Sequence, residues 1–198
     1  MSKLEFFFDC SSPWTYLGFE SLEQMRGRHP DLKVLYKPFL VGGVFNAVNP
    51  SVYANRDNPV PAKQVYSKKD LQDWCTYVGI QIGQPPVFPV NSVKAMRGAF
   101  VALENECIVP YARAVFKRYW TDLDDISQET VLREIVSEVG LDETEFFERI
   151  SQQAYKDMLR QNTEELIERG GFGSPTLFLN TDDMYFGNDR MALIEAKL

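Results

Sequence analysis

A hydroxyl residue stands where a predicted strand ends and a predicted helix begins. Ser12 follows the apolar run from Leu4 to Phe8, and Pro13 follows Ser12. Ser at the N-cap and Pro at the first helical position are typical signals of a helix start. A helix N-terminus offers free N–H groups and a partial positive charge, so Ser12 and these groups together could stabilise an anion, such as the thiolate of a ligand. The same residues are also compatible with an ordinary helix start.

Two segments near the C-terminus carry polar groups at similar positions. Ser174 and Pro175 precede a predicted strand, and a proline that adopts the cis form there exposes the backbone of the preceding residue to a peptide-like ligand. A proline that merely begins a strand is the alternative. Asn188 and Asp189 lie in a turn before the last predicted helix, where the helix start can bind a carboxylate and Asp189 can bind an ammonium group. One small ligand, glutathione, carries all the groups that these segments and Ser12 could bind, since it has a thiol, carboxylates, an ammonium group and two amides.

Other catalytic and metal-binding patterns are absent from the sequence. His29 is the single histidine, and its position between Arg28 and Pro30 favours a surface turn over a Ser-His-Asp triad. One histidine and three scattered cysteines predict no metal site. Neither the P-loop nor the Rossmann glycine pattern is present, so the sequence contains neither of these nucleotide-binding motifs.

The composition limits the class of protein. The 198 residues are 44% hydrophobic and carry a net charge of −7, which favours a folded acidic domain and argues against nucleic-acid binding. No apolar run is long enough for a membrane span or a signal peptide. Cys10, Cys75 and Cys107 suggest no disulfide framework, so we expect a cytoplasmic protein in which Cys75 and Cys107 are small buried apolar residues.

The order of the predicted elements indicates an α/β, thioredoxin-like fold. Strands are expected near residues 4–8, 32–36, 177–179 and 184–186, with a helix after the first strand and another after the last, capped by Asp189 and running to Leu198. A thioredoxin-like domain of residues 1–65 and 170–198 then surrounds a helical insertion domain of residues 66–169. Within the insertion we expect helices from Asp70 to Val78 and near 93–106, 110–120, 125–139 and 142–169, with capping-box character at Asp142. Residues 44–66 are rich in Asn and Pro and are expected to be the least structured part.

Taken together, the motifs resemble those of the family of 2-hydroxychromene-2-carboxylate isomerases and kappa-class glutathione transferases, a branch of the DsbA-like thioredoxin fold. The resemblance covers essentially the whole chain. It is carried by four segments, which are Phe8-Asp9 followed by Ser12–Glu20, Val93–Arg97, Phe172–Thr176 and Phe186–Met191.

The resemblance implies a role for each matching residue. Ser12 matches the catalytic serine that stabilises the glutathione thiolate. Ser174 matches the residue before the cis-proline, here Pro175, whose backbone pairs with the cysteinyl unit of glutathione. Asn188 and Asp189 match the residues that hold the γ-glutamyl end.

Two further glutathione contacts follow from the resemblance, together with a set of pocket residues. Lys63 resembles the family lysine near the glycine end, and Asn49 resembles the family's loop asparagine, with Asn46 as a competitor. Trp14 is expected to line the substrate pocket. Other plausible pocket walls are aromatic, namely Phe45, Tyr53 and Phe88.

The sequence departs from the family pattern at two places. Cys10 and Ser11 stand where the family usually has two apolar residues. Cys10 lies two residues too early to stand at the helix start, so we assign it no nucleophilic role. Ser11 is an alternative to Ser12, but it does not directly precede the proline. Residues 50–62 match poorly, and they are expected to shape the pocket of the second substrate.

The implied activity is a glutathione-dependent isomerisation of 2-hydroxychromene-2-carboxylate or a related aromatic-degradation intermediate. In the family mechanism the glutathione thiolate adds to the conjugated substrate, the ring-opened adduct rotates about a carbon–carbon bond, and expulsion of thiolate gives trans-hydroxybenzylidenepyruvate. The resemblance also implies a homodimer.

The sequence leaves other functions open. One alternative is a kappa-like transferase or peroxidase, and another is a non-catalytic thioredoxin-like protein that binds glutathione. A disulfide oxidoreductase is disfavoured, because Ser12 and Thr15 stand at the two positions of a CxxC motif.

Overall fold

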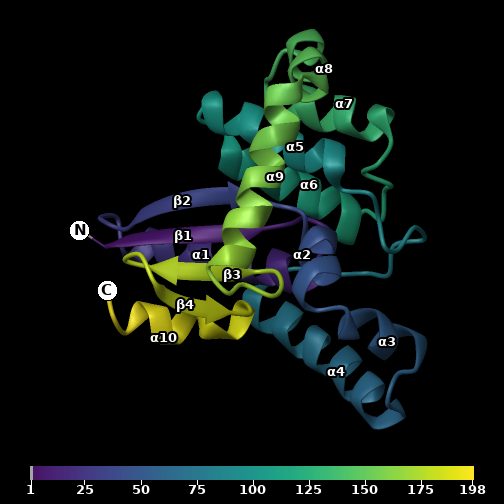
Figure 1. Cartoon of the computed structure of the whole chain (residues 1–198), viewed down its shortest axis with the longest axis vertical. Coiled ribbons are helices and arrows are strands. Elements are labelled where there is room, and N and C mark those ends of the chain that lie inside the picture. Colours follow the sequence, from purple (N-terminus) through teal and green to yellow (C-terminus); the bar gives the residue numbers. More distant parts are fainter. Residues whose placement is uncertain (1) are drawn as a thin grey trace.

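A computed structural model describes residues 2–198 and places four strands and ten helices in this part of the chain (Figure 1). The elements in chain order are β1 (Lys3–Phe8), α1 (Pro13–Arg28), β2 (Lys33–Pro38), α2 (Val41–Val48), α3 (Ser51–Asp57), α4 (Pro61–Val78), α5 (Val93–Glu104), α6 (Ile108–Trp120), α7 (Glu129–Glu138), α8 (Glu143–Ser151), α9 (Gln153–Glu168), β3 (Thr176–Leu179), β4 (Asp183–Phe186), the 3-10 turn η1 (Asn188–Arg190) and α10 (Met191–Glu195). The fold is a DsbA-like thioredoxin fold in which helices predominate.

The four strands form one mixed sheet in the order β2-β1-β3-β4. β1 is parallel to β2 and antiparallel to β3, and Phe7 of β1 lies opposite Thr176 of β3. Because strand side chains alternate between faces, Phe6 and Phe8 point to one face and Phe7 points to the other. The apolar run of β1 is therefore explained by burial on both faces.

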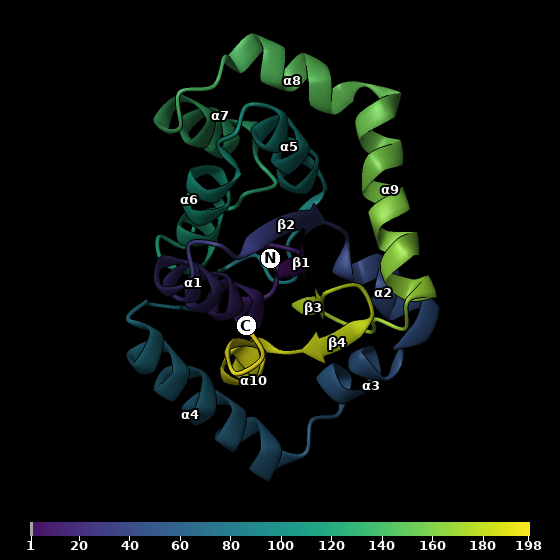
Figure 2. The same cartoon turned by 90° about the vertical axis from the view of Figure 1, so that its left-hand side faces the viewer.

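Helices cover both faces of the sheet (Figure 2). On one face, Phe6 and Phe8 belong to a large core that includes Phe19 of α1, Phe116 of α6 and Ile194 of α10. On the other face, a smaller core joins the sheet to α2 and α9, and its buried residues are Phe7, Phe39, Val44, Leu166 and Phe178. Helix α4 packs on the outer side of α1 through a third cluster that includes Leu17 and Cys75.

Most of the predicted elements are confirmed, with boundaries shifted by at most four residues. All four predicted strands form. Ser12 is the N-cap of α1, and Asp142 is the N-cap of α8, where its carboxylate accepts a hydrogen bond of 2.7 Å from the N–H of Glu145. The expected single helical stretch after Asp142 is instead two helices, because the chain turns at Gln152 between α8 and α9.

The expectation for residues 44–66 is wrong. This stretch contains most of α2, all of α3 and the start of α4, and α4 begins at Pro61 rather than at Asp70. Its prolines mark helix starts, since Pro50 is the N-cap of α3 and Pro61 is the first residue of α4. Both helices are largely exposed, so they lack the apolar periodicity by which a helix is recognised in a sequence.

The expected cap at Asp189 is also wrong. Asp189 lies inside η1, and α10 follows with Arg190 at its N-cap and ends at Glu195, without a side-chain capping bond. The division into two domains stays a prediction. Its boundary after residue 65 falls inside the continuous helix α4, and the large core contains residues of both proposed domains.

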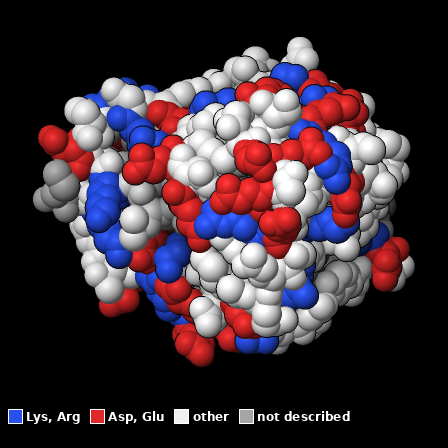
Figure 3. Space-filling model, turned by 90° about the horizontal axis from the view of Figure 1, so that it is seen from above, with Lys and Arg blue, Asp and Glu red and all other residues white. Residues whose placement is uncertain are grey.

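Charges of both signs intermingle on the upper surface of the molecule (Figure 3). Ion pairs connect the helices of the insertion, for example Arg149 of α8 with Glu104 of α5. No helix in the described residues has the length and apolar character needed to cross a membrane.

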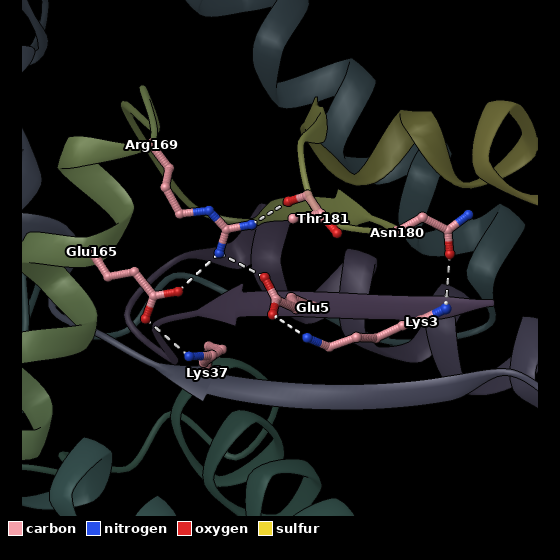
Figure 4. Close-up of polar contacts among 7 residues, drawn as sticks. All are labelled: Lys3, Glu5, Lys37, Glu165, Arg169, Asn180 and Thr181. Carbon is pink, nitrogen blue, oxygen red and sulfur yellow. Dashed lines mark hydrogen bonds and ion pairs between the residues drawn. The ribbon is translucent and has the colours of Figure 1, made fainter. Parts of the chain in front are cut away.

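A network of ion pairs lies along the sheet beside α9 (Figure 4). Glu5 of β1 is 8% exposed, and its carboxylate accepts hydrogen bonds of 2.8 Å from Lys3 and 2.6 Å from Arg169. Arg169 also binds Glu165, which in turn binds Lys37 of β2. Burial raises the pKa of Glu5, but Lys3 and Arg169 lower it more, so the pKa lies below its ordinary value.

We expect Glu5→Gln to remove stability in a pH-dependent way. At pH 7 the variant should lose about 2 kcal/mol of unfolding free energy, because the charge-assisted hydrogen bonds become neutral ones. A carboxyl with a lowered folded pKa contributes stability above its ordinary pKa of about 4.3 and loses that contribution as the pH falls through the folded value. Urea unfolding at pH 7, 5 and 3 should therefore show the two proteins converging in acid.

Glu164→Gln is the matched control, because Glu164 lies on α9 and forms an exposed ion pair of 3.7 Å with Arg160. Its cost should stay below about 0.5 kcal/mol at every pH. A loss in Glu5→Gln that does not change with pH would contradict the assigned role of the charge.

Candidate active site

A cleft of about 660 Å³ opens at the carboxyl end of β1. Its walls come from segments far apart in sequence, which are the start of α1, helices α2 and α3, the loop before α5 and the loop before β3. The lining residues are Asp9, Ser11–Trp14, Leu40–Gly43, Phe45, Asn49, Val52, Tyr53, Arg56, Phe88–Val93, Phe172–Ser174 and Phe186. The volume lies within the range of small-molecule sites, about 300–1,000 Å³.

Ser12 lines this cleft at the N-terminus of the 16-residue helix α1. Its hydroxyl oxygen accepts a hydrogen bond of 3.3 Å from the N–H of Thr15 and donates one of 3.3 Å to the carbonyl of Ser174. Both bonds are long, so an anion in the cleft can compete for the hydroxyl proton. The helix N-terminus favours negative charge at the same place.

Ser174 meets Ser12 across the cleft, and the Ser174–Pro175 peptide bond is cis. The side chain of Ser174 is 7% exposed and accepts hydrogen bonds of 2.7 Å from the hydroxyl of Thr15 and 3.1 Å from the N–H of Asp9. Thr15, the second position of the CxxC pattern, is fully buried and engaged in this contact. Of the two CxxC positions, the geometry therefore leaves one with an accessible hydroxyl, Ser12, beside a backbone segment that borders the cleft.

Asp9 connects three of the cleft walls. Its carboxylate accepts hydrogen bonds of 3.0 Å from the N–H of Ser11 and 2.9 Å from the N–H of Val41, and Ser92 provides a third. Burial raises the pKa of Asp9, and these donors oppose that rise in part. Asp9 thereby fixes the ends of β1 and α2 relative to each other, a role that the sequence analysis did not assign.

Cys10 does not face the cleft. It is 1% exposed, its carbonyl accepts a hydrogen bond of 2.9 Å from the indole of Trp120, and burial raises the pKa of its thiol well above the usual range. The thiolate form needed for nucleophilic attack is thus disfavoured. Cys75 is buried as expected, while Cys107 is only partly buried, which corrects the expectation for it.

The predicted pocket residues come together in the cleft. Trp14, Phe45, Tyr53 and Phe88 all line it, and the Phe45 and Tyr53 rings meet edge to face with centroids 6.4 Å apart. They arrive from α1, α2, α3 and the loop before α5, so the tertiary fold assembles the aromatic wall. Their contact with a substrate stays a prediction.

Of the two competing asparagines, Asn49 lines the cleft. Its side-chain amide donates a hydrogen bond of 3.1 Å to the carbonyl of Phe172, and its oxygen accepts one of 2.9 Å from Ser51. Asn46 lies outside the lining, and its side-chain oxygen accepts a hydrogen bond of 2.8 Å from Tyr53. Asn49 therefore borders the cleft and Asn46 does not, and the contact of Asn49 with glutathione stays a prediction.

Asn188 lies beside the cis-proline, and neither Asn188 nor Asp189 belongs to the cleft lining. A Cβ atom on Gly18 of α1 would lie 3.0 Å from Pro175 and 3.6 Å from Asn188, so the three residues are neighbours. Asn188 is 5% exposed, and its side-chain nitrogen has no acceptor among residues 2–198. Asp189 is exposed and lies 3.4 Å from Arg190.

Lys63 lies away from the cleft. It is exposed near the start of α4 and lines a separate shallow hollow with Asn55, Pro59 and Gln64. Lys63 is therefore not one of the cleft-lining residues, and its contact with the glycine end of glutathione stays a prediction. In the described part of the chain, no cluster of His, Cys, Asp and Glu could hold a metal ion.

One charged cleft residue was missed in the sequence. Arg56 of α3 lines the cleft with its guanidinium group 5.8 Å from the Phe45 ring centroid and 5.5 Å from that of Phe88. The available signal was that Arg56 is the single arginine of residues 44–66.

Comparisons with known proteins agree with this fold. The family described as DSBA-like thioredoxin domain matches residues 3–198. A 2-hydroxychromene-2-carboxylate isomerase of Pseudomonas putida is 30% identical over 98% of this chain and 93% of that protein. Glutathione S-transferase kappa 1 of Caenorhabditis elegans is 25% identical over 98% of this chain and 89% of that protein.

The solved structures give the same relationship. A structure of 2-hydroxychromene-2-carboxylate isomerase superimposes with a TM-score of 0.83 at 26% identity, covering 98% of this chain and 93% of the other. The chain therefore belongs to the DsbA-like thioredoxin family, in the branch that includes 2-hydroxychromene-2-carboxylate isomerases and kappa-class glutathione transferases.

Proposed function

We propose that the protein is a glutathione-dependent isomerase that converts 2-hydroxychromene-2-carboxylate, or a related aromatic-degradation intermediate, to trans-hydroxybenzylidenepyruvate. Its relatives include isomerases and transferases of this branch, which supports an enzymatic role. We further propose a cytoplasmic homodimer, as the family resemblance implies.

The position of Ser12 carries the proposal. Its hydroxyl lies at the N-terminus of α1, 3.3 Å from the carbonyl before the cis-proline, in a cleft with aromatic walls. A hydroxyl donor and a helix N-terminus that converge on one point favour a thiolate there over the neutral thiol.

The residues around the cis-proline fit glutathione. Asn188 has a buried donor without an acceptor in the described residues, and a ligand carboxylate next to Pro175 would supply one. The backbone of Ser174 borders the cleft and can pair with the cysteinyl unit of a peptide-like ligand. When bound, glutathione supplies the thiolate that adds reversibly to the conjugated substrate.

The protein's own contribution to the reaction is binding and electrostatics. Ser12 holds its proton toward the sulfur and so lowers the pKa of the bound thiol. The aromatic walls, which include Trp14 and Phe45, exclude water and orient a flat substrate. No net oxidation occurs, which agrees with the absence of cysteine from positions 12 and 15.

A kappa-like transferase or peroxidase is the second candidate. The same thiolate site would serve attack on an electrophile or a peroxide, and kappa-class relatives cover nearly the whole chain. The two candidates differ in what happens after attack, since the isomerase regenerates glutathione within each turnover.

We expect Ser12→Ala to lower the glutathione-dependent rate about 100-fold, the usual effect of removing one positioned hydrogen-bond donor. The pKa of bound glutathione, followed by thiolate absorbance, should rise in the variant because the donor to the anion is lost. Calorimetric titration with reduced glutathione should show that binding persists at reduced affinity.

Ser11→Ala tests the neighbouring hydroxyl. Ser11 also borders the cleft but does not cap α1, so its replacement should leave the thiol pKa within about 0.3 units of wild type. A larger effect from Ser11→Ala than from Ser12→Ala would transfer the proposed role to Ser11.

We expect conversion of the chromene to proceed with no net consumption of glutathione. Parallel assays should follow conjugation of 1-chloro-2,4-dinitrobenzene and reduction of cumene hydroperoxide, each with a thiol count before and after reaction. Stoichiometric loss of thiol together with inactivity toward the chromene would establish the transferase alternative instead. Binding without turnover in all three assays would indicate a non-catalytic binding protein.

A further inference from the structure

Arg56 has an unusual environment for an arginine of this chain. Its guanidinium group lies 5.8, 6.0 and 5.5 Å from the ring centroids of Phe45, Tyr53 and Phe88, which come from α2, α3 and the loop before α5. Contacts of this kind hold the guanidinium group by cation–π attraction. They leave its N–H groups free to donate hydrogen bonds to an anion.

Arg56 forms no ion pair within residues 2–198. Of the eleven arginines in the sequence, nine pair with a carboxylate in the described chain, and they are Arg26, Arg28, Arg113, Arg118, Arg133, Arg149, Arg160, Arg169 and Arg190. The other exception is Arg97 of α5, which is not part of the cleft lining.

The charge balance of the cleft points to an anionic ligand. Asp9 and Arg56 are the two Asp, Glu, Lys or Arg residues among those that line it. Asp9 is buried and its carboxylate is satisfied by N–H groups of the chain, so it is not a partner for a ligand cation. Arg56 is the charged cleft residue that has no ion-pair partner in the described chain, and it is positive in a protein whose net charge is −7.

The surroundings of Arg56 also select the shape of the ligand. Three aromatic rings beside a guanidinium fork suit a flat, unsaturated body that carries a carboxylate at its edge. The planar guanidinium binds a carboxylate through two parallel hydrogen bonds, which fixes the orientation of the body.

We propose that Arg56 is the residue that binds the carboxylate of the second substrate and so selects planar aromatic acids over their uncharged analogues. The proposal rests on the proposed function for the identity of the natural substrate, and it deepens that function by assigning the acid group to one side chain. The segment involved is the one that matches the family pattern poorly.

The test measures binding without chemistry. The protein is first saturated with S-methylglutathione, which lacks a free thiol, and is then titrated calorimetrically with trans-cinnamate and with trans-cinnamamide, two flat ligands that differ in charge. Wild type should prefer the carboxylate by about 30-fold, and Arg56→Met should reduce the preference to about 2-fold or less. Arg56→Lys should retain part of the preference, because it keeps the charge but loses the fork.

A matched control removes one positive charge outside the cleft. Lys156 is exposed on α9 and forms no ion pair in the described chain, so Lys156→Met should keep the wild-type preference. Circular dichroism and thermal midpoints of all variants should agree with wild type, since Arg56 is itself exposed.

A second arm separates the two carboxylate sources. Arg56→Met should bind reduced glutathione within about 3-fold of wild type; a larger loss there would mean that Arg56 holds a glutathione carboxylate, and would overturn the proposal. Equal binding of cinnamate and cinnamamide by wild type would also overturn it. Carboxylate preference that depends on Arg56, in a protein inactive toward the chromene, would uphold the subsite and reject the isomerase reaction.

Discussion

The hydroxyl of Ser174 is the contact on which the candidate site depends. It accepts hydrogen bonds from the hydroxyl of Thr15, 159 residues away in sequence, and from the N–H of Asp9. These bonds bring the loop before β3 against the start of α1, so the carbonyl of Ser174 meets the hydroxyl of Ser12. Without this junction the cleft would have a helix N-terminus but no opposing backbone to which a ligand could pair.

The sheet makes that junction possible. Because β1 and β3 are antiparallel neighbours, the end of one strand lies beside the start of the other, and the residues after Phe8 necessarily face those before Thr176. Burial of β1 on both faces fixes its register, since a slip by one residue would exchange Phe7 with Phe6 and Phe8 between two differently shaped cores. The helical segments then complete the cleft from outside, with Asp9 connecting the end of β1 to the start of α2.

Local sequence signals predict the residues around Ser12 and Ser174, but they do not predict helices α3 and α4. The apolar run of β1, the Ser-Pro start of α1 and the Ser-Pro segment before β3 act within a few residues, and each appears as expected. Helices α3 and α4 have few buried residues, so their sequences carry no clear apolar period, and their prolines resemble loop signals. The contacts of Arg56 depend on tertiary structure, because Phe45, Tyr53 and Phe88 come together only in the fold. No local sequence pattern predicts them.

The contacts of Thr15 separate this site from that of a protein with a redox-active disulfide. In a CxxC protein the residue at this position is the second cysteine of the redox pair. Here Thr15 is fully buried and its hydroxyl is committed to Ser174, so it is part of the scaffold. Ser12 alone remains at the cleft, with a hydroxyl that can donate to an anion but cannot be oxidised to a disulfide. If the protein binds a thiol, the helix N-terminus that would stabilise a protein thiolate in a redox relative acts instead on the sulfur of the ligand.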